Sequence, residues 1–257
     1  MNLAHRLKRA SRVALWHLIG SAVVAACAAT LVFGLWYPHP YDELSGGVNL
    51  FGLLVGADLV CGPLLTLVLF SPYKKRAELM RDLGLVGLVQ LVALVYGLWT
   101  VAVARPVFLV FELDRFRVVS AAEIEPADLA NAMDGFQRLG FGGPKIIAAR
   151  VARAGDEDFL RSVDLSLRGL GPALRPSAWR PYASAREAVL GKARPLALLM
   201  ERYPERAKDI ETQSKKTGLA VDQIGYVPVQ GRHELFWVAL VARQDARVIG
   251  FLDVDGL

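Results

Sequence analysis

The chain has 257 residues, of which 54% are hydrophobic and 21% charged, and its mean hydropathy is +0.34. This balance is too apolar for a disordered protein and unusual for a fully water-soluble enzyme. The net charge of +5 and the pI of about 9.3 come largely from basic residues beside apolar runs, so they do not indicate a nucleic-acid-binding surface. Residues 1–104 hold eight Lys or Arg and five Asp or Glu, against 22 and 20 in residues 105–257. The apolar excess therefore lies in the first part.

Three apolar runs, at residues 13–36, 48–70 and 83–103, predict three transmembrane helices. Roughly 20 apolar helical residues cross a bilayer core, where the backbone has no water to bond and must form helices. The flanking segments 1–12 and 71–82 carry four basic residues each, whereas the segment 38–47 carries none. Because cationic loops stay in the cytoplasm, we expect residues 105–257 on the opposite side of the membrane.

The first run has two competing interpretations. A cleaved signal peptide is disfavoured because the run is longer than the roughly 7–15 apolar residues of such a peptide. Residues 24–27 (VAAC) also resemble a lipoprotein cleavage box, which leaves lipidation of Cys27 open. Residues 28–36 would then remain as an apolar segment outside the membrane, so an uncleaved anchoring helix is preferred.

Asp58 lies near the middle of the second run, where inserting a charged residue costs about 2.5–3.5 kcal/mol. Gln90 of the third run lies about one helical turn from the depth of Asp58, so a hydrogen bond between the two is one interpretation. The other is a polar contact to the transmembrane helix of a partner. Gly62 and Pro63 follow one turn later, and the proline predicts a kink beside Asp58. Asp58, Gly62, Pro63 and Gln90 are therefore the candidate site residues.

Glycines in the second and third runs predict that these helices approach closely, within the protein or against a partner helix. They are Gly52, Gly56, Gly84, Gly87 and Gly97.

Residues 105–257 predict an α+β domain joined to the third run with almost no linker. Strands are expected at 107–112, 145–151, 224–229, 235–243 and 248–254, and residues 117–119 extend the first strand or form another. Helices are expected at 125–139, 156–169, 196–203 and 205–217, with a further one opening at a capping box, Ser184–Glu187. The short connections between the last three strands favour an antiparallel meander.

No catalytic, cofactor or metal site is expected in this domain, which has no cysteine and one histidine, His233. Residues 140–144 (GFGGP) lack the ending of a phosphate-binding loop, and residues 253–256 (DVDG) supply only the start of a calcium loop. A solvated surface is preferred to an anion site for Arg105, Arg115 and Arg117, and spacing does not single out Ser184 and Lys192 as a catalytic dyad.

Residues 50–76 and 85–119, with the preceding Ser45–Gly47, resemble the TfpX/TfpZ-type accessory proteins of bacterial type IV pilins. The resemblance implies an inner-membrane protein with a periplasmic domain, which binds or stabilises a type IV pilin and promotes or modulates pilus assembly. The implied partners are the pilin, the pilus assembly machinery and the lipid bilayer, with no nucleic acid, no cofactor and no enzymatic activity.

Two other classes of function remain. A membrane-anchored sensor or signalling partner would need a cytoplasmic output domain, and the segments 1–12 and 71–82 are too short to form one. A membrane-associated hydrolase or transferase would need a pocket with clustered titratable groups in residues 105–257.

Overall fold

The computed structural model describes residues 3–71, 74–231 and 237–256, and the chain forms two compact units. Unit 1 comprises Met1–Pro38 and Gly47–Ala104, and unit 2 comprises His39–Gly46 and Arg105–Leu257. His233 and the first residues of the strand expected at 235–243 lie outside the described residues. The second unit thus includes the short segment His39–Gly46 in addition to the residues that follow Ala104.

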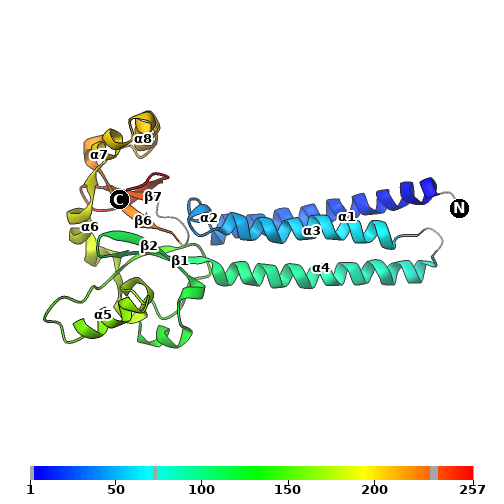
Figure 1. Cartoon of the computed structure of the whole chain (residues 1–257), viewed down its shortest axis with the longest axis horizontal. Coiled ribbons are helices and arrows are strands. Elements are labelled where there is room, and N and C mark those ends of the chain that lie inside the picture. Colours follow the sequence, from blue (N-terminus) through cyan, green and yellow to red (C-terminus); the bar gives the residue numbers. More distant parts are fainter. Residues whose placement is uncertain (1–2, 72–73, 232–236, 257) are drawn as a thin grey trace. The chain divides into compact units, whose positions relative to one another are not determined.

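Unit 1 consists of long apolar helices that lie side by side (Figure 1). Helix α1 spans Leu3–Leu31 and continues as a π-helical turn, Val32–Trp36, while α3 spans Gly47–Leu69 and α4 spans Arg76–Ala104. Each is long and apolar enough to cross a bilayer, and only 11% of its most apolar stretch is buried inside the protein. The apolar side chains thus face outward, as a lipid environment requires. The prediction of three long apolar helices is confirmed.

Close helix contacts in unit 1 depend on some of its glycines. A Cβ atom at Gly97 would lie 2.1 Å from Leu54 Cδ1, so this glycine lets α4 approach α3. At the other four glycines singled out above, by contrast, an added Cβ would meet no atom within 4 Å.

Helix α3 runs continuously through Pro63, and the kink expected there stays a prediction.

Unit 2 is built on a mixed eight-stranded sheet with the order β4-β3-β1-β2-β6-β7-β8, in which β5 also pairs with β6. The strands are β1 Pro106–Glu112, β2 Arg115–Ser120, β3 Lys145–Ala149, β4 Trp179–Pro181, β5 Arg194–Pro195, β6 Ile224–Gln230, β7 Trp237–Ala242 and β8 Val248–Leu252. Its helices are α2 Tyr41–Leu44, α5 Phe159–Leu167, α6 Arg186–Lys192, α7 Leu196–Arg202 and α8 Ala207–Lys216.

The last three strands form the expected antiparallel meander, and β1 and β2 form an antiparallel hairpin. The sheet is mixed because β1 also pairs with β3, and β2 with β6, in parallel. Every residue of β1 is buried, as the continuous apolar run predicts for a central strand.

Three local predictions in unit 2 are wrong. The helix expected at 125–139 is replaced by a 3₁₀ segment, Pro126–Asn131, followed by irregular backbone in which Gly135 has φ +89°, a conformation that a helix excludes. Ser184 does not cap a helix, because its hydroxyl donates to the Pro181 carbonyl and α6 begins later. The loop expected at 169–181 ends in strand β4, whose Trp179 is fully buried.

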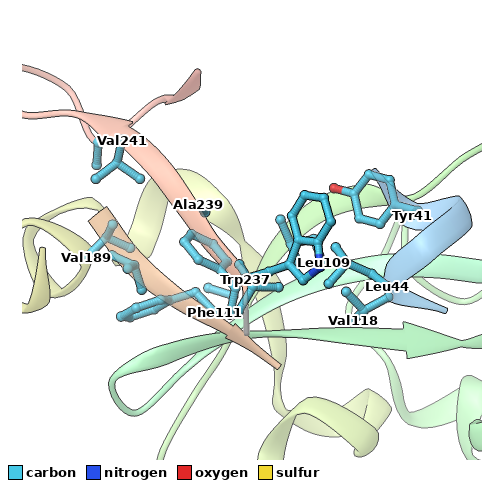
Figure 2. Packing of buried hydrophobic residues seen from close by; sticks show 14 residues of the cluster. Tyr41, Leu44, Leu109, Phe111, Val118, Val189, Trp237, Ala239 and Val241 are labelled. Carbon is cyan, nitrogen blue, oxygen red and sulfur yellow. The ribbon is translucent and has the colours of Figure 1, made fainter. Parts of the chain in front are cut away.

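The segment His39–Gly46 is part of the hydrophobic core of unit 2. Its helix α2 places Tyr41 and Leu44 against side chains from the sheet, including Leu109 and Trp237 (Figure 2). Tyr41 also meets Phe251 edge-on, with ring centroids 5.7 Å apart. The connection between the first two long helices and residues 105–257 therefore fold as one body.

Candidate functional site

A chain of polar side chains links the three long helices of unit 1. The imidazole of His17 on α1 lies with Nδ1 2.6 Å from Thr66 Oγ1 on α3 and with Nε2 2.6 Å from Gln90 Oε1 on α4. Thr66 is fully buried, and the other two side chains are half-buried. Polar groups at this depth have no water to bond, so they pair with one another.

The orientation of Gln90 fixes the hydrogen-bond roles in this network. Its Nε2 donates to the main-chain carbonyl of Asp58 at 3.2 Å, which leaves Oε1 as the acceptor that faces His17. His17 then donates from Nε2, and in the neutral imidazole Nδ1 accepts the hydroxyl proton of Thr66. With these roles, each donor in this network of side chains faces an acceptor.

Gly62 makes the network sterically possible. A Cβ atom at this position would lie 2.2 Å from Gln90 Nε2, closer than two unbonded atoms can approach. The absence of a side chain on α3 therefore creates the space that the Gln90 amide occupies. Gly62 thus acts by permitting a contact between α3 and α4.

A cavity of about 300 Å³ lies between the three helices beside this network. Small residues of α1 and α4 leave the space open: Gly20, Ser21, Ala25 and Gly87. Asp58 lines the cavity together with His17 and Gln90, and within the described part of the chain its carboxylate accepts no hydrogen bond. The site is thus an apolar recess with a polar end, large enough to receive a side chain of a neighbouring helix.

The structure brings together three of the four predicted site residues. Asp58, Gly62 and Gln90 meet at the α3–α4 contact, although Gln90 bonds the carbonyl of Asp58 and not its carboxylate. Pro63 is in the next position on α3 and does not line the cavity. The sequence interpretation missed His17 and Thr66. His17 is the one strongly polar side chain of its apolar run, and that signal could have revealed it.

In unit 2, the arginines considered as an anion site each bond a nearby group. Arg105 donates to the Gly140 carbonyl, Arg115 to the carboxylate of Asp114 at 2.9 Å, and Arg117 to that of Glu123 at 3.4 Å. The Arg115 guanidinium holds the pKa of the Asp114 carboxyl below its usual range. These groups therefore do not form a shared anion site.

His39, Asp42 and Glu43 bring three potential metal-ligating atoms within 4.8 Å of one another. Two of the three side chains are exposed, and His39 Nδ1 lies 3.3 Å from Asp42 Oδ1. Exposed acidic groups of this kind are common without a metal ion, so the cluster is not assigned as a metal site.

Comparisons with known proteins agree on one kind of protein. Residues 5–46 match the family model described as "Fimbrial assembly protein FimB". Two curated relatives from Dichelobacter nodosus, the fimbrial assembly proteins of serogroups I and E1, are 33% and 32% identical over 233 residues, which is 90% of this chain and 90% of each relative. The fimbrial assembly protein of serogroups C1 and C2 is 42% identical over 123 residues, 48% of this chain and 94% of that relative. No solved structure matches.

Proposed function

The chain belongs to the FimB family of fimbrial assembly proteins, and from this premise we propose that it is a TfpX/TfpZ-type accessory factor of a type IV pilus. In this proposal the protein binds or stabilises a pilin in the inner membrane and promotes or modulates its assembly. Its N-terminus is cytoplasmic, and unit 2 is periplasmic.

The placement of the segment His39–Gly46 supports this topology. With three membrane spans, the connection after the first span and the chain after the third emerge on the same side. Tyr41 and Leu44 from the connection are buried in the core that residues 105–257 build, so both parts must reach one compartment. The basic segments 1–12 and 71–82 then lie in the cytoplasm, as the charge distribution favours. A reporter active only in the cytosol, fused after Leu257, should stay silent, and activity there would contradict the proposal.

The polar cavity in unit 1 carries the proposed contact with the pilin. An unassembled pilin is an apolar membrane helix that bears an external head. A carboxylate and an amide at the end of an apolar recess suit a partner helix that inserts a side chain with a hydrogen-bond donor. The open glycines on α3 and α4 leave room for such a helix to approach closely.

Cysteine crosslinking within the membrane tests this contact. Cys27 and Cys61 are first replaced by alanine, and a single cysteine is then introduced at position 91 or 89 of α4. Leu91 lines the cavity, and Val89 does not. The two side chains are matched controls, since they are 57% and 56% exposed. We expect disulfide or bismaleimide adducts with a cysteine-bearing pilin helix from position 91 and not from position 89. Equal yields from both positions, or no adduct when both proteins are present, would contradict the proposal.

The proposal assigns no enzymatic activity to the protein. Asp58 then acts through binding, so Asp58→Asn should reduce surface pili while the amount of the protein and its hydrogen-bonded helix packing stay unchanged. If the protein were a sensor or a hydrolase instead, Asp58→Asn would leave pilin binding normal and would remove a downstream signal or a product.

A further inference from the structure

Helix α5 of unit 2 exposes a continuous apolar stripe. Leu160 and Leu167 lie two turns apart on the same face of the helix and are 79% and 84% exposed. Val163 lies between them and is 42% exposed. Leu170, just after the helix, is a further exposed apolar side chain, 44% exposed. Soluble domains seldom gather large apolar side chains on one exposed helix face unless a partner covers it.

Polar contacts attach the opposite face and the start of α5 to unit 2. Ser162 is buried, and its hydroxyl accepts a hydrogen bond of 2.7 Å from Arg175. Before the helix, Asp158 binds the guanidinium of Arg150 at 2.7 Å, directly after strand β3. These polar contacts attach the helix to unit 2 at its start and at Ser162, while none of its described apolar side chains belongs to the hydrophobic core of that unit.

Helix α5 lies at the end of the sheet that is remote from the point where the chain enters unit 2 after α4. Strand β1 begins beside Arg105, the first residue after α4, and β3 runs parallel to β1. Helix α5 is anchored at the carboxyl ends of these two strands through Arg150. At about 3.3 Å per residue, the seven residues of β1 span roughly 20 Å between Arg105 and this end of the sheet.

The size of the stripe favours a transient contact. Four partly exposed aliphatic side chains present an apolar surface on the order of a few hundred Å². A stable interface of standard size takes about 800 Å² from each partner, so the stripe is too small for a permanent dimer of this chain. It matches the apolar centre of a contact that forms and is released, as assembly of a subunit into a larger structure requires.

A cleft of about 670 Å³ lies beside the start of α5 and is lined by more basic than acidic side chains. Arg150, Arg153 and Arg180 line it, against one acidic side chain, Asp156. Arg150 contacts both Asp156 and Asp158, so it joins the cleft to the start of α5. A partner surface complementary to both features has an apolar patch bordered by carboxylates.

We propose that the exposed face of α5 and the adjoining cleft dock the external head of the pilin, through an apolar patch bordered by carboxylates on that head. The identity of the partner rests on the proposed function, whereas the location of the surface rests on α5 and the cleft. The contact lies outside the membrane and is separate from the cavity among the long helices.

Photo-crosslinking of the full chain in cells that make the pilin tests the surface. A photoreactive phenylalanine derivative replaces Leu160 or Leu167, and the control position is Leu198, a leucine on α7 that is 48% exposed. We expect pilin adducts from positions 160 and 167 and none from 198. Adducts with a second copy or with lipid would assign the surface to those occupants and overturn the proposal.

Two further arms distinguish the causes of failure. Arg153→Glu should lower the adduct yield at position 167 severalfold, whereas Lys208→Glu, the same charge change on α8, should not. If position 167 gives no pilin adduct while position 91 in the membrane does, the α5 proposal is wrong and the proposed function stands. If neither position crosslinks to pilin, both are wrong.

Discussion

Replacement of Gly62 by alanine should destabilise the packing of the three long helices, and the same replacement at Gly56 should not. Both glycines lie inside α3, so the change in helix propensity is the same at the two sites. A Cβ at Gly56 meets no atom within 4 Å, whereas one at Gly62 would lie 2.2 Å from Gln90 Nε2. The difference between the two variants therefore measures the contact with Gln90.

The magnitude follows from the bonds that Gln90 must give up. Its amide is the end of a flexible side chain and can move away from a Cβ, but the movement breaks the bond to the Asp58 carbonyl and the bond to His17. Hydrogen bonds between membrane helices contribute about 0.6 kcal/mol on average and up to about 1.7 kcal/mol. Losing two of them predicts that Gly62→Ala lowers the free energy of unfolding by about 1–3 kcal/mol relative to Gly56→Ala.

The assay is reversible unfolding in mixed micelles, followed by tryptophan fluorescence, for the two single variants and for each of them combined with Gln90→Leu. Because Gly62→Ala acts by displacing Gln90, its cost should disappear in the Gln90→Leu background, which gives a coupling free energy of similar size. Equal stabilities of Gly56→Ala and Gly62→Ala, or a cost at Gly62 that persists without Gln90, would refute the reasoning.

Three predictions concern unit 2, each read from its thermal or denaturant unfolding in the full chain. Tyr41→Ala should cost about 3–5 kcal/mol because a large buried ring is lost from the core, whereas the exposed Glu43→Ala should cost less than about 0.5 kcal/mol. Tyr182→Phe should cost about 1 kcal/mol because the hydroxyl and its hydrogen bond to a main-chain carbonyl are lost. Burial raises the pKa of Tyr182 to about 12, so the stability difference between wild type and Tyr182→Phe should hold to about pH 10 and shrink as the pH rises through 12. Arg150 lowers the pKa of the Asp158 carboxyl, so any stability difference between wild type and Asp158→Asn should be present at pH 7 and vanish as the pH falls below about 4.

The parts of the fold that could be predicted from sequence are those with a strong local signal. Length and hydropathy predict the three long helices, and short connections predict the β6-β7-β8 meander. The parallel pairs β1–β3 and β2–β6 join segments far apart in the chain, and local periodicity carries no information about such pairing. Strand β4 was missed because its three residues lie in a stretch rich in Gly and Pro, where pairing with β3 outweighs the local preference.

The candidate site shows the same division. Its Asp58, Gly62 and Gln90 stand out because polar or small residues are conspicuous in an apolar run. The contact of His17 with Thr66 depends on the relative rotation of α1 and α3, which hydropathy does not fix. Thr66 gives no signal of its own, since a threonine can bond its own helix backbone and is common in membrane helices.

The segment His39–Gly46 links membrane insertion to the folding of unit 2. The core of this unit needs Tyr41 and Leu44, which precede α3 and α4, and also the strands that follow both helices. The core can therefore close only after α3 and α4 have been inserted and both flanking parts of the chain have reached the same side. Residues 105–257 alone lack two buried core side chains and retain the apolar surface that these cover. The apparent linker between the first two membrane helices is thus a structural part of the domain. Docking on α5 should therefore be measured with the full chain, in which the core of unit 2 is complete.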